Sequence, residues 1–526
     1  MKKTGLLLLG ALLTLLASTA SAQPKRYLDR VFTNVKRTNS VVYGSNYTVL
    51  TISTLGRTFR EPLLMDVYEP EGDTLAQRPL VLYFHTGNFL PWINPVTGLS
   101  VNQSCGGTRN DPAAVEICTR LAQMGYVVAS VSYRLGWRPD LLDELQRRFT
   151  LINAAYRSIQ DARTCIRFFR RDVALNNNQF RIDPNRIVLF GQGTGGYVTL
   201  NTAALDKYSE ILNTSEPGKF IINNTPMVIE KYNGDPYGIQ AAPGIVDAAY
   251  NAVTGFPVGD TLYVPNHVGY SSDFKLAVNL GGALGDKAWL DKNTPPILSF
   301  HVPQDPFAPC GDGLVIVPGV NFPVVNVTGS CGIQPIQDQL GNNAVFSLGG
   351  LLSDPISVFA RTINGGREGF YPFLRAANDS SPWDWNRIIP NTQLPNGQVV
   401  PLNCNTDSVA ARRVIDTIIA YYAPRACRAL GLNCPGISVK AEEVFDASLV
   451  LTVFPNPATS GMWFSSDSEH PIQAIEVFDI SGRMVRQVRG IEASTYVLQR
   501  DGLPDGIYVA KLYFPQGVAA RRILFE

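Results

Sequence analysis

Between residues 79 and 300, short apolar segments alternate with segments that have the apolar and charged faces of helices. The apolar segments read as buried strands, and they lie at residues 79–85, 126–133, 186–190, 274–280 and 296–300. Residues 111–124 and 154–171 fall between them and read as helices. Because a helix that connects two neighbouring strands makes them parallel and covers the sheet, this alternation predicts an α/β domain with a doubly wound, mostly parallel sheet. Residues 48–52 and 63–68 predict an antiparallel start.

A glycine-rich turn follows the third of these strands. It covers residues 191–196 and reads GQGTGG, with Gly193 and Thr194 at its centre. Sheets of this kind place their binding and catalytic groups at the carboxyl ends of the strands. We therefore expect this turn to belong to the functional site.

Charge and histidine content exclude several kinds of chemistry. The chain has 45 Lys and Arg against 44 Asp and Glu, a net charge of +1, and no long run of one sign. A protein that neutralises many phosphates needs a basic surplus, so no nucleic-acid partner is expected. The chain has only four histidines, so a reaction that needs one must use His85, His267, His301 or His470.

The first 22 residues have the features of a secretory signal peptide. Lys2 and Lys3 precede an apolar run at residues 5–16, and the small residues 20–22 suit a cleavage site. No other stretch approaches the ~18 apolar residues of a transmembrane helix. We therefore expect residues 1–22 to be removed and the mature chain to be exported without a transmembrane segment.

Export places the eight cysteines in an oxidising environment, where disulfides form. Short intervals along the chain favour two pairs, Cys310 with Cys331 and Cys427 with Cys434. The pairing of the other four cysteines stays open. Metal binding is less favoured because the chain has no C-x-x-C pair and few histidines, and no cofactor is expected.

The end of the chain differs in character from the rest. Residues 436–448 read as a linker, and residues 449–526 read as short strands separated by turns, which predicts a small all-β sandwich. Taken alone, this pattern fits an adhesion or spacer module.

The motifs of this tail are more specific than its strand pattern. PNPA at residues 455–458 is followed by FDISGR at 478–483, LPDGIYVAKL at 503–512 and a basic, apolar terminus. In this order they resemble the C-terminal sorting domains of the type IX secretion system. The resemblance implies the type IX machinery as a partner through residues 449–526, and a secreted or outer-membrane cell-surface location. It also implies cleavage of the tail and attachment to surface lipopolysaccharide.

The larger part of the chain resembles the α/β-hydrolase fold, in particular secreted carboxylesterases. The resemblance runs from about residue 43 to 435 and rests on residues 64–68, 133–136, 183–187 and 296–301, on Asp305, and on residues 85–89, HTGNF, in the place of an oxyanion-hole motif HGGGF. It implies a domain over residues 23–435, with a cap insertion at about 205–273.

This chain lacks the nucleophile and the base of that family at the expected positions. A nucleophile elbow reads G-x-S-x-G, but the position of the serine holds Gly193 and the motif occurs nowhere else. Thr194 is the fallback nucleophile. If Asp305 is the triad acid, the base must follow it, yet no histidine lies between Asp305 and residue 435. The segment 363–370, where we place the base, carries Glu368.

These losses predict an exported pseudo-esterase that acts in binding or surface structure. The backbone at Gly87, Asn88 and Thr194 is expected to form an oxyanion-like pocket for a carboxylate or carbonyl group. A small molecule or a surface glycan are both possible ligands. Four aromatic residues could line the cleft, namely Phe89, Trp92, Trp383 and Trp385.

Two alternatives stay open. The first is an active carboxylester hydrolase with Thr194 as an atypical nucleophile and an acidic base such as Glu368. The second is a surface assembly or adhesion protein that uses the fold only as a structural unit. His85 and His301, each at the end of a buried strand, are expected to be structural.

Overall fold

The computed structural model describes residues 25–90, 107–317, 322–381, 383, 385, 392–393, 399–400, 407–437, 451–466, 470–479, 483–515 and 517–526. The predicted signal peptide, nearly all of the predicted linker, and Trp92, Cys105 and Cys404 lie outside these residues. The chain divides into two compact units, one formed by most residues up to 437 and the other by the residues from 438 onward. Each unit is described by itself.

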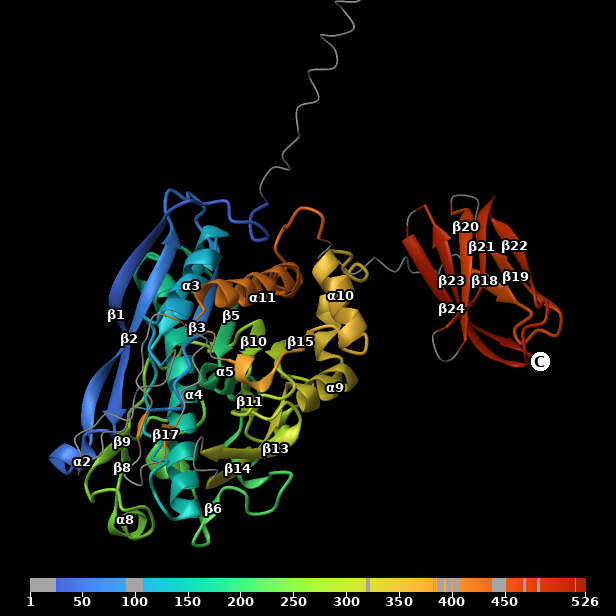
Figure 1. Ribbon diagram of the computed structural model, residues 1–526. Helices are drawn as coiled ribbons and strands as arrows, with labels where there is room; N and C mark the ends of the chain where they lie inside the picture. The colour runs from blue at the N-terminus through green and yellow to red at the C-terminus, as the bar shows by residue number, and fades with distance from the viewer. Residues whose placement is uncertain are drawn as a thin grey trace, which may run out of the picture. The chain divides into compact units, whose positions relative to one another are not determined.

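An eight-stranded sheet forms the centre of the larger unit (Figure 1). Its strands, in spatial order, are β1 (Val35–Thr48), β2 (Phe59–Pro70), β4 (Val127–Val131), β3 (Arg78–Phe84), β5 (Ile182–Gln192), β10 (Leu276–Leu280), β12 (Ile297–His301) and β15 (Phe370–Pro372). The pairs β1–β2 and β2–β4 are antiparallel, and every later pair is parallel. The predicted fold class is therefore confirmed.

The first strand differs from the prediction. We expected it at residues 48–52, but β1 ends at Thr48 and residues Ile52–Leu55 form the short helix α2. The cause is the position of β1 at the edge of the sheet, where half-exposed polar residues replace the continuous apolar run of a central strand.

Helices cover both faces of the sheet. On one face, α4 (Glu144–Leu175) and α5 (Thr194–Ala204) pack on Leu80, Leu82 and Phe84 of β3. On the other face, α3 (Pro112–Gln123) and α11 (Ser408–Ala429) pack on Val81 and Tyr83. Successive side chains of a strand point to opposite faces, so a strand buried on both sides is apolar throughout, as β3 is.

The remaining elements of this unit lie between or beside the sheet strands. Between α5 and β10 the chain forms α6 (Tyr208–Leu212), β6 (Ile221–Ile222), β7 (Thr225–Pro226), α7 (Glu230–Asn233), β8 (Gly244–Ile245), α8 (Ala248–Thr254) and β9 (Thr261–Tyr263). A second sheet contains β11 (Ala283–Leu284), β14 (Phe322–Gly329) and β13 (Asp312–Val317). The other elements are η1 (Lys287–Trp289), α9 (Ser330–Leu340), η2 (Asn342–Ser347), α10 (Pro355–Ile363), η3 (Ala377–Asp379), β16 (Thr392–Gln393) and β17 (Val399–Val400).

The smaller unit is a two-sheet antiparallel β-sandwich. One sheet contains β18 (Thr452–Phe454), β19 (Gly461–Ser465) and β22 (Thr495–Gln499), and the other contains β21 (Met484–Ala493), β20 (Ile472–Asp479), β23 (Gly506–Phe514) and β24 (Gly517–Phe525). Phe464 from the first sheet and Ile475 and Leu512 from the second belong to one buried cluster. This unit therefore has its own hydrophobic core, as predicted for a β-sandwich.

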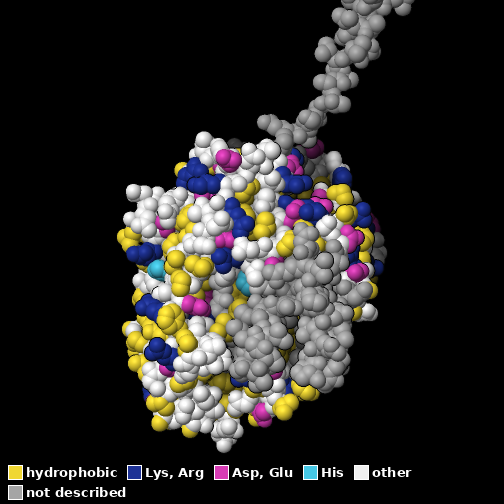
Figure 2. All heavy atoms as spheres, turned by 60° about the vertical axis from the view of Figure 1, so that its left-hand side comes forward, with side chains coloured by type: hydrophobic (Ala, Val, Ile, Leu, Met, Phe, Trp, Pro, Cys, Tyr) yellow, Lys and Arg dark blue, Asp and Glu magenta, His cyan; other side chains and the backbone are white. Residues whose placement is uncertain are grey.

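Both predicted disulfides are present, Cys310–Cys331 and Cys427–Cys434. Cys118 and Cys165 are free and buried. No helix within the described part of the chain is long and apolar enough to cross a membrane. On the face that carries β1 and β2, basic and acidic side chains are interspersed (Figure 2).

Candidate functional site

A sharp turn joins the carboxyl end of β5 to the first residue of α5. β5 ends at Gln192, α5 begins at Thr194, and Gly193 between them has φ 54° and ψ −115°. Residues with a side chain rarely adopt a positive φ of this kind, whereas glycine does so readily. This backbone is that of a strand-to-helix elbow, the turn on which an α/β hydrolase carries its nucleophile. Gly193 therefore has the position and backbone of a nucleophile but no reactive group.

The space into which a side chain at residue 193 would project is already filled. An ideal Cβ built on Gly193 overlaps with Oγ1 of Thr86 and lies 2.9 Å from Cβ of Thr86. It also lies 3.3 Å from Oγ of Ser381, which is buried and has no hydrogen-bond partner. Thr86 as placed therefore cannot coexist with a nucleophile at position 193.

Two backbone amides beside this turn bond to hydroxyl groups of the protein. The Thr194 amide donates to Oγ1 of Thr86 at 3.2 Å, and the Asn88 amide donates to Oγ1 of Thr194 at 2.6 Å. Both amides belong to the oxyanion-like pocket expected at Gly87, Asn88 and Thr194. An incoming oxyanion would have to displace the two hydroxyls before it could accept these bonds.

Asp305 follows the carboxyl end of β12 and lies beside the elbow. Its Oδ1 accepts hydrogen bonds from the amides of Phe307 and Ala308 at 2.8 and 3.1 Å. An ideal Cβ on Gly281 would lie 3.4 Å from Oδ2 of Asp305 and 3.2 Å from Cβ of Ser381, which places these two side chains near each other. Burial raises the pKa of Asp305 to about 7, and the two amides lower it in part.

The structure does not bring Glu368 to this site. Glu368 precedes β15 and so lies at the amino end of that strand, whereas Gly193 and Asp305 follow the carboxyl ends of their strands. Its carboxylate pairs with Arg361 at 3.1 Å and with Arg425. Ser381, in the segment after β15, is the residue that approaches Gly193. Recognition of the three-residue strand β15 in the sequence would have moved the expected base position to the segment after that strand, which contains Ser381.

The histidines bond to groups of the protein. Nδ1 of His85 lies 2.6 Å from the Thr86 carbonyl, and the ring stacks on Tyr133 with centroids 4.7 Å apart. The His301 ring nitrogens lie 2.9 Å from Oγ of Ser330 and from the Ala308 carbonyl. Burial lowers the pKa of both histidines to about 4, so both rings are neutral at pH 7. Nε2 of His267 lies 2.8 Å from a backbone carbonyl, and His470 is in the sandwich.

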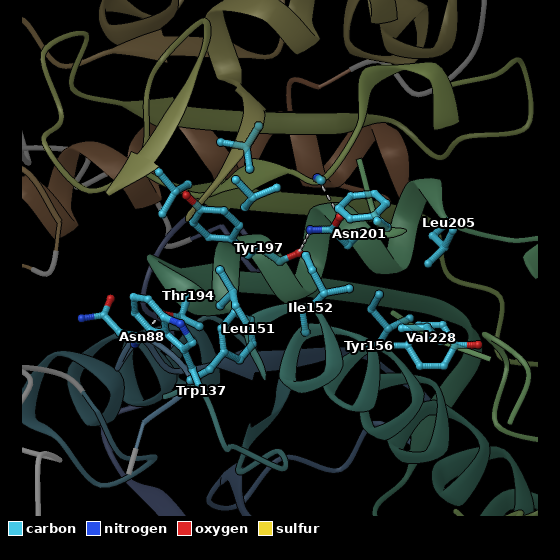
Figure 3. Close-up of a pocket in the computed structure, with 18 of the residues that line it drawn as sticks. Asn88, Trp137, Leu151, Ile152, Tyr156, Thr194, Tyr197, Asn201, Leu205 and Val228 are labelled. Carbon is cyan, nitrogen blue, oxygen red and sulfur yellow. Dashed lines mark hydrogen bonds between the residues drawn. The ribbon is translucent and has the colours of Figure 1, made fainter. Parts of the chain in front are cut away.

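A mostly apolar pocket adjoins Asn88 and Thr194 (Figure 3). The space among its lining atoms, open mouth included, measures about 920 Å³. The lining comes from α4, α5, the segment between α5 and β10, and β13 and β14, and it includes Leu151, Ile152, Tyr156, Tyr197, Asn201, Leu205, Ile211, Phe220, Val228, Val315, Val325 and Val327. Its apolar lining with a few polar groups is that of a small-molecule site.

Of the aromatic residues expected in the cleft, only Phe89 lines the pocket among those described. Trp383 and Trp385 belong to the buried cluster on the opposite face of the sheet. The tryptophans that do line the pocket are Trp137 and Trp289. Trp137 directly follows residues 133–136 and Trp289 lies in η1, and tertiary folding brings both to the pocket. In the described residues, no three His, Cys, Asp or Glu side chains form a group that could hold a metal ion.

The strand order, the elbow after β5 and the acidic residue after β12 define an α/β-hydrolase fold. Residues 452–526 match the family model of the secretion system C-terminal sorting domain, and this segment is a domain of that family. The sorting domain marks the chain for export, to the cell surface or the medium.

Three solved structures illustrate what this chain is similar to. A truncated carbohydrate esterase from gut microbiota is 14% identical, with 59% of this chain and 86% of that chain covered and a TM-score of 0.29. The apo form of esterase 2 from Thermogutta terrifontis is 17% identical, with 47% and 70% covered and a TM-score of 0.26. Esterase B from Lactobacillus rhamnosis HN001 is 15% identical, with 49% and 51% covered and a TM-score of 0.22. No curated protein matches the chain.

Proposed function

We propose that this protein is an exported pseudo-esterase, which binds a ligand in the pocket beside the elbow and does not hydrolyse it. One observation carries the proposal. At the elbow, Gly193 provides no nucleophile, and the side chain of Thr86 occupies the space that a nucleophile would need. The pocket itself stays open and apolar.

The chemistry of ester hydrolysis supports this reading. The reaction needs a nucleophile, a base that takes its proton, and donors for the oxyanion. When nucleophile and base are lost, only binding and the oxyanion donors still contribute to the rate. Here the Asn88 and Thr194 amides are bonded to hydroxyls of the protein, which weakens that remaining contribution as well.

Two features argue against Thr194 as a nucleophile. Its Oγ1 is held by the 2.6 Å hydrogen bond from the Asn88 amide. The acidic base suggested for it, Glu368, lies at the amino end of β15 in an ion pair with Arg425. For a surface assembly protein that uses the fold only as a structural unit, the open apolar pocket has no role.

Turnover of short-chain aryl esters tests the proposal. The full mature chain is incubated with p-nitrophenyl acetate and butyrate, with the Thr194→Val variant as a matched control. We expect no release of nitrophenol above the buffer rate from either protein. Robust turnover that Thr194→Val abolishes would contradict the proposal and support an active hydrolase.

A further inference from the structure

Two hydrogen-bond donors in the pocket have no acceptor. Nε1 of Trp137 and Oη of Tyr197 are buried, line the pocket and have no hydrogen-bond partner. An indole N–H can only donate, so Trp137 cannot be satisfied by another donor. A buried donor without a partner destabilises the protein, because the donor loses its hydrogen bonds to water and gains none in return. These two donors therefore need acceptor atoms that the protein does not supply.

Both donors lie near the elbow. Tyr197 is one turn after Thr194 on α5, and the backbone amide of Trp137 donates to the Phe89 carbonyl at 3.2 Å. Figure 3 shows Trp137 and Tyr197 toward the end of the pocket that holds Thr194, with Leu205 and Val228 toward the other end. The pocket thus has one end with donors and one apolar end.

Three other polar side chains in the lining are already bonded. Oη of Tyr156 donates to the Gly234 carbonyl at 2.7 Å, and Nε1 of Trp289 donates to the Glu210 carbonyl at 2.7 Å. Asn201 donates to the Tyr197 carbonyl at 2.7 Å. Trp137 and Tyr197 therefore differ from chemically identical neighbours in the same pocket, and those neighbours serve as controls.

The charges around the pocket disfavour an anion. Among the described residues that line it, none is Lys, Arg or His. Burial is the main cause of the raised pKa of the Tyr197 hydroxyl, and the negative charge of the nearby Asp305 raises it further. A carboxylate in this apolar space would lose its hydration and gain no cation in return.

We propose that the pocket takes an uncharged, mostly apolar molecule whose acceptor oxygen or oxygens bond to Nε1 of Trp137 and Oη of Tyr197. Acyl esters, amides and ketones have this chemistry, and their alkyl chains fit the apolar end at Leu205 and Val228. The inference rests on the proposed function, because an active hydrolase would not retain an ester.

Calorimetric titration of the full mature chain with three matched probes tests the inference. The probes are methyl octanoate, octanoate and decane, which are a neutral acceptor, an anion and a hydrocarbon. We expect methyl octanoate to bind most tightly at pH 7.5. Trp137→Phe and Tyr197→Phe should each lower the ratio of methyl octanoate to decane affinity about three- to tenfold, the contribution of one hydrogen bond.

Tyr156→Phe is the control, because it removes a pocket hydroxyl that is already bonded to Gly234. We expect it to leave the ratio of methyl octanoate to decane affinity unchanged. Octanoate binding as tight as the ester, no binding of the ester, or an ester-to-decane ratio that Trp137→Phe and Tyr197→Phe leave unaltered would overturn the inference. Release of methanol would instead overturn the proposed function, so the two failures are distinguishable.

Discussion

Thr86 and Gly193 are complementary in size. In the family that this chain resembles, a glycine follows the oxyanion-hole histidine and a serine stands at the elbow, whereas here the larger residue is Thr86 and the elbow holds glycine. The Thr86 hydroxyl occupies the vacated space and accepts the hydrogen bond of the Thr194 amide. Restoring the nucleophile therefore requires two changes at the elbow and not one.

This complementarity predicts the outcome of rebuilding a triad. Gly193→Ser alone should give no esterase activity and should lower stability by about 1–2 kcal/mol or more, because its Cβ meets Thr86 and its φ is positive. The triple variant T86G/G193S/S381H should show measurable turnover of p-nitrophenyl acetate, since Ser381 lies beside Gly193 and Asp305 lies near Ser381. The matched variant T86G/G193S/E368H should stay inactive, and activity in it would contradict the placement of Glu368.

Asp305 gives stability a pH dependence of its own. The pKa of its carboxyl is 3.8 in the unfolded chain and about 7 in the folded one, because burial disfavours the charged form. Between these values the folded protein keeps a proton that the unfolded chain has released, so the free energy of unfolding falls as pH rises. The decrease in the free energy of unfolding that Asp305 causes levels off above pH 7 and amounts to about 4 kcal/mol at most.

Asp305→Asn should remove this dependence. The variant retains an oxygen for the Phe307 and Ala308 amides but cannot ionise. Urea unfolding of the two proteins at pH 5 and pH 8 should show a larger drop for the wild type. An equal drop in both proteins would show that Asp305 is not the group responsible.

At the scale of elements, Glu368 joins three of them. It precedes β15, and its carboxylate pairs with Arg361 of α10 and Arg425 of α11. Arg425 is fully buried, so removal of the carboxylate leaves a buried charge without its partner. Glu368 is thus a residue that holds helices to the end of the sheet, away from the elbow.

Glu368→Gln should therefore lower the stability of the fold and leave ligand binding unchanged. We expect the free energy of unfolding to fall by about 3–5 kcal/mol, with the affinity for methyl octanoate unchanged in the folded protein. Glu144→Gln, which breaks the half-exposed pair with Arg148, is the control and should cost about 0–1 kcal/mol. A loss of ligand affinity with unchanged stability would place Glu368 in the site after all.

The central strands were predictable because burial on both faces makes them continuously apolar, as in β3 and β5. The elbow was predictable because its glycines follow such a strand directly. β15 is not predictable from the sequence because three residues are too few to show an alternation of apolar and polar side chains. For this reason the predicted base position lies before β15, whereas the residue that approaches Gly193 lies after it. Trp137, Trp289 and Ser381 reach the pocket or the elbow only through long-range folding.

At the scale of the whole molecule, two units with separate cores carry two roles. The clusters around the sheet of the larger unit and the core of the sandwich share no residue. The sorting domain at residues 452–526 accounts for export.

Deletion of residues 438–526 tests this division of roles. In a bacterium with a type IX secretion system, the shortened chain should disappear from the cell surface and the medium and accumulate in the periplasm, as immunoblots of fractions would show. Its thermal unfolding midpoint should match that of the larger unit in the full chain. Undiminished surface display of the shortened chain would contradict the role given to the tail.

Intact-mass spectrometry after exposure to a fluorophosphonate tests most directly the claim that the elbow carries no nucleophile. Such probes phosphonylate an activated hydroxyl and add a fixed mass to the protein. After prolonged incubation, the full mature chain should keep its unmodified mass, while the T86G/G193S/S381H variant gains one phosphonyl group. Stoichiometric labelling of the wild type that Thr194→Val abolishes would contradict the account.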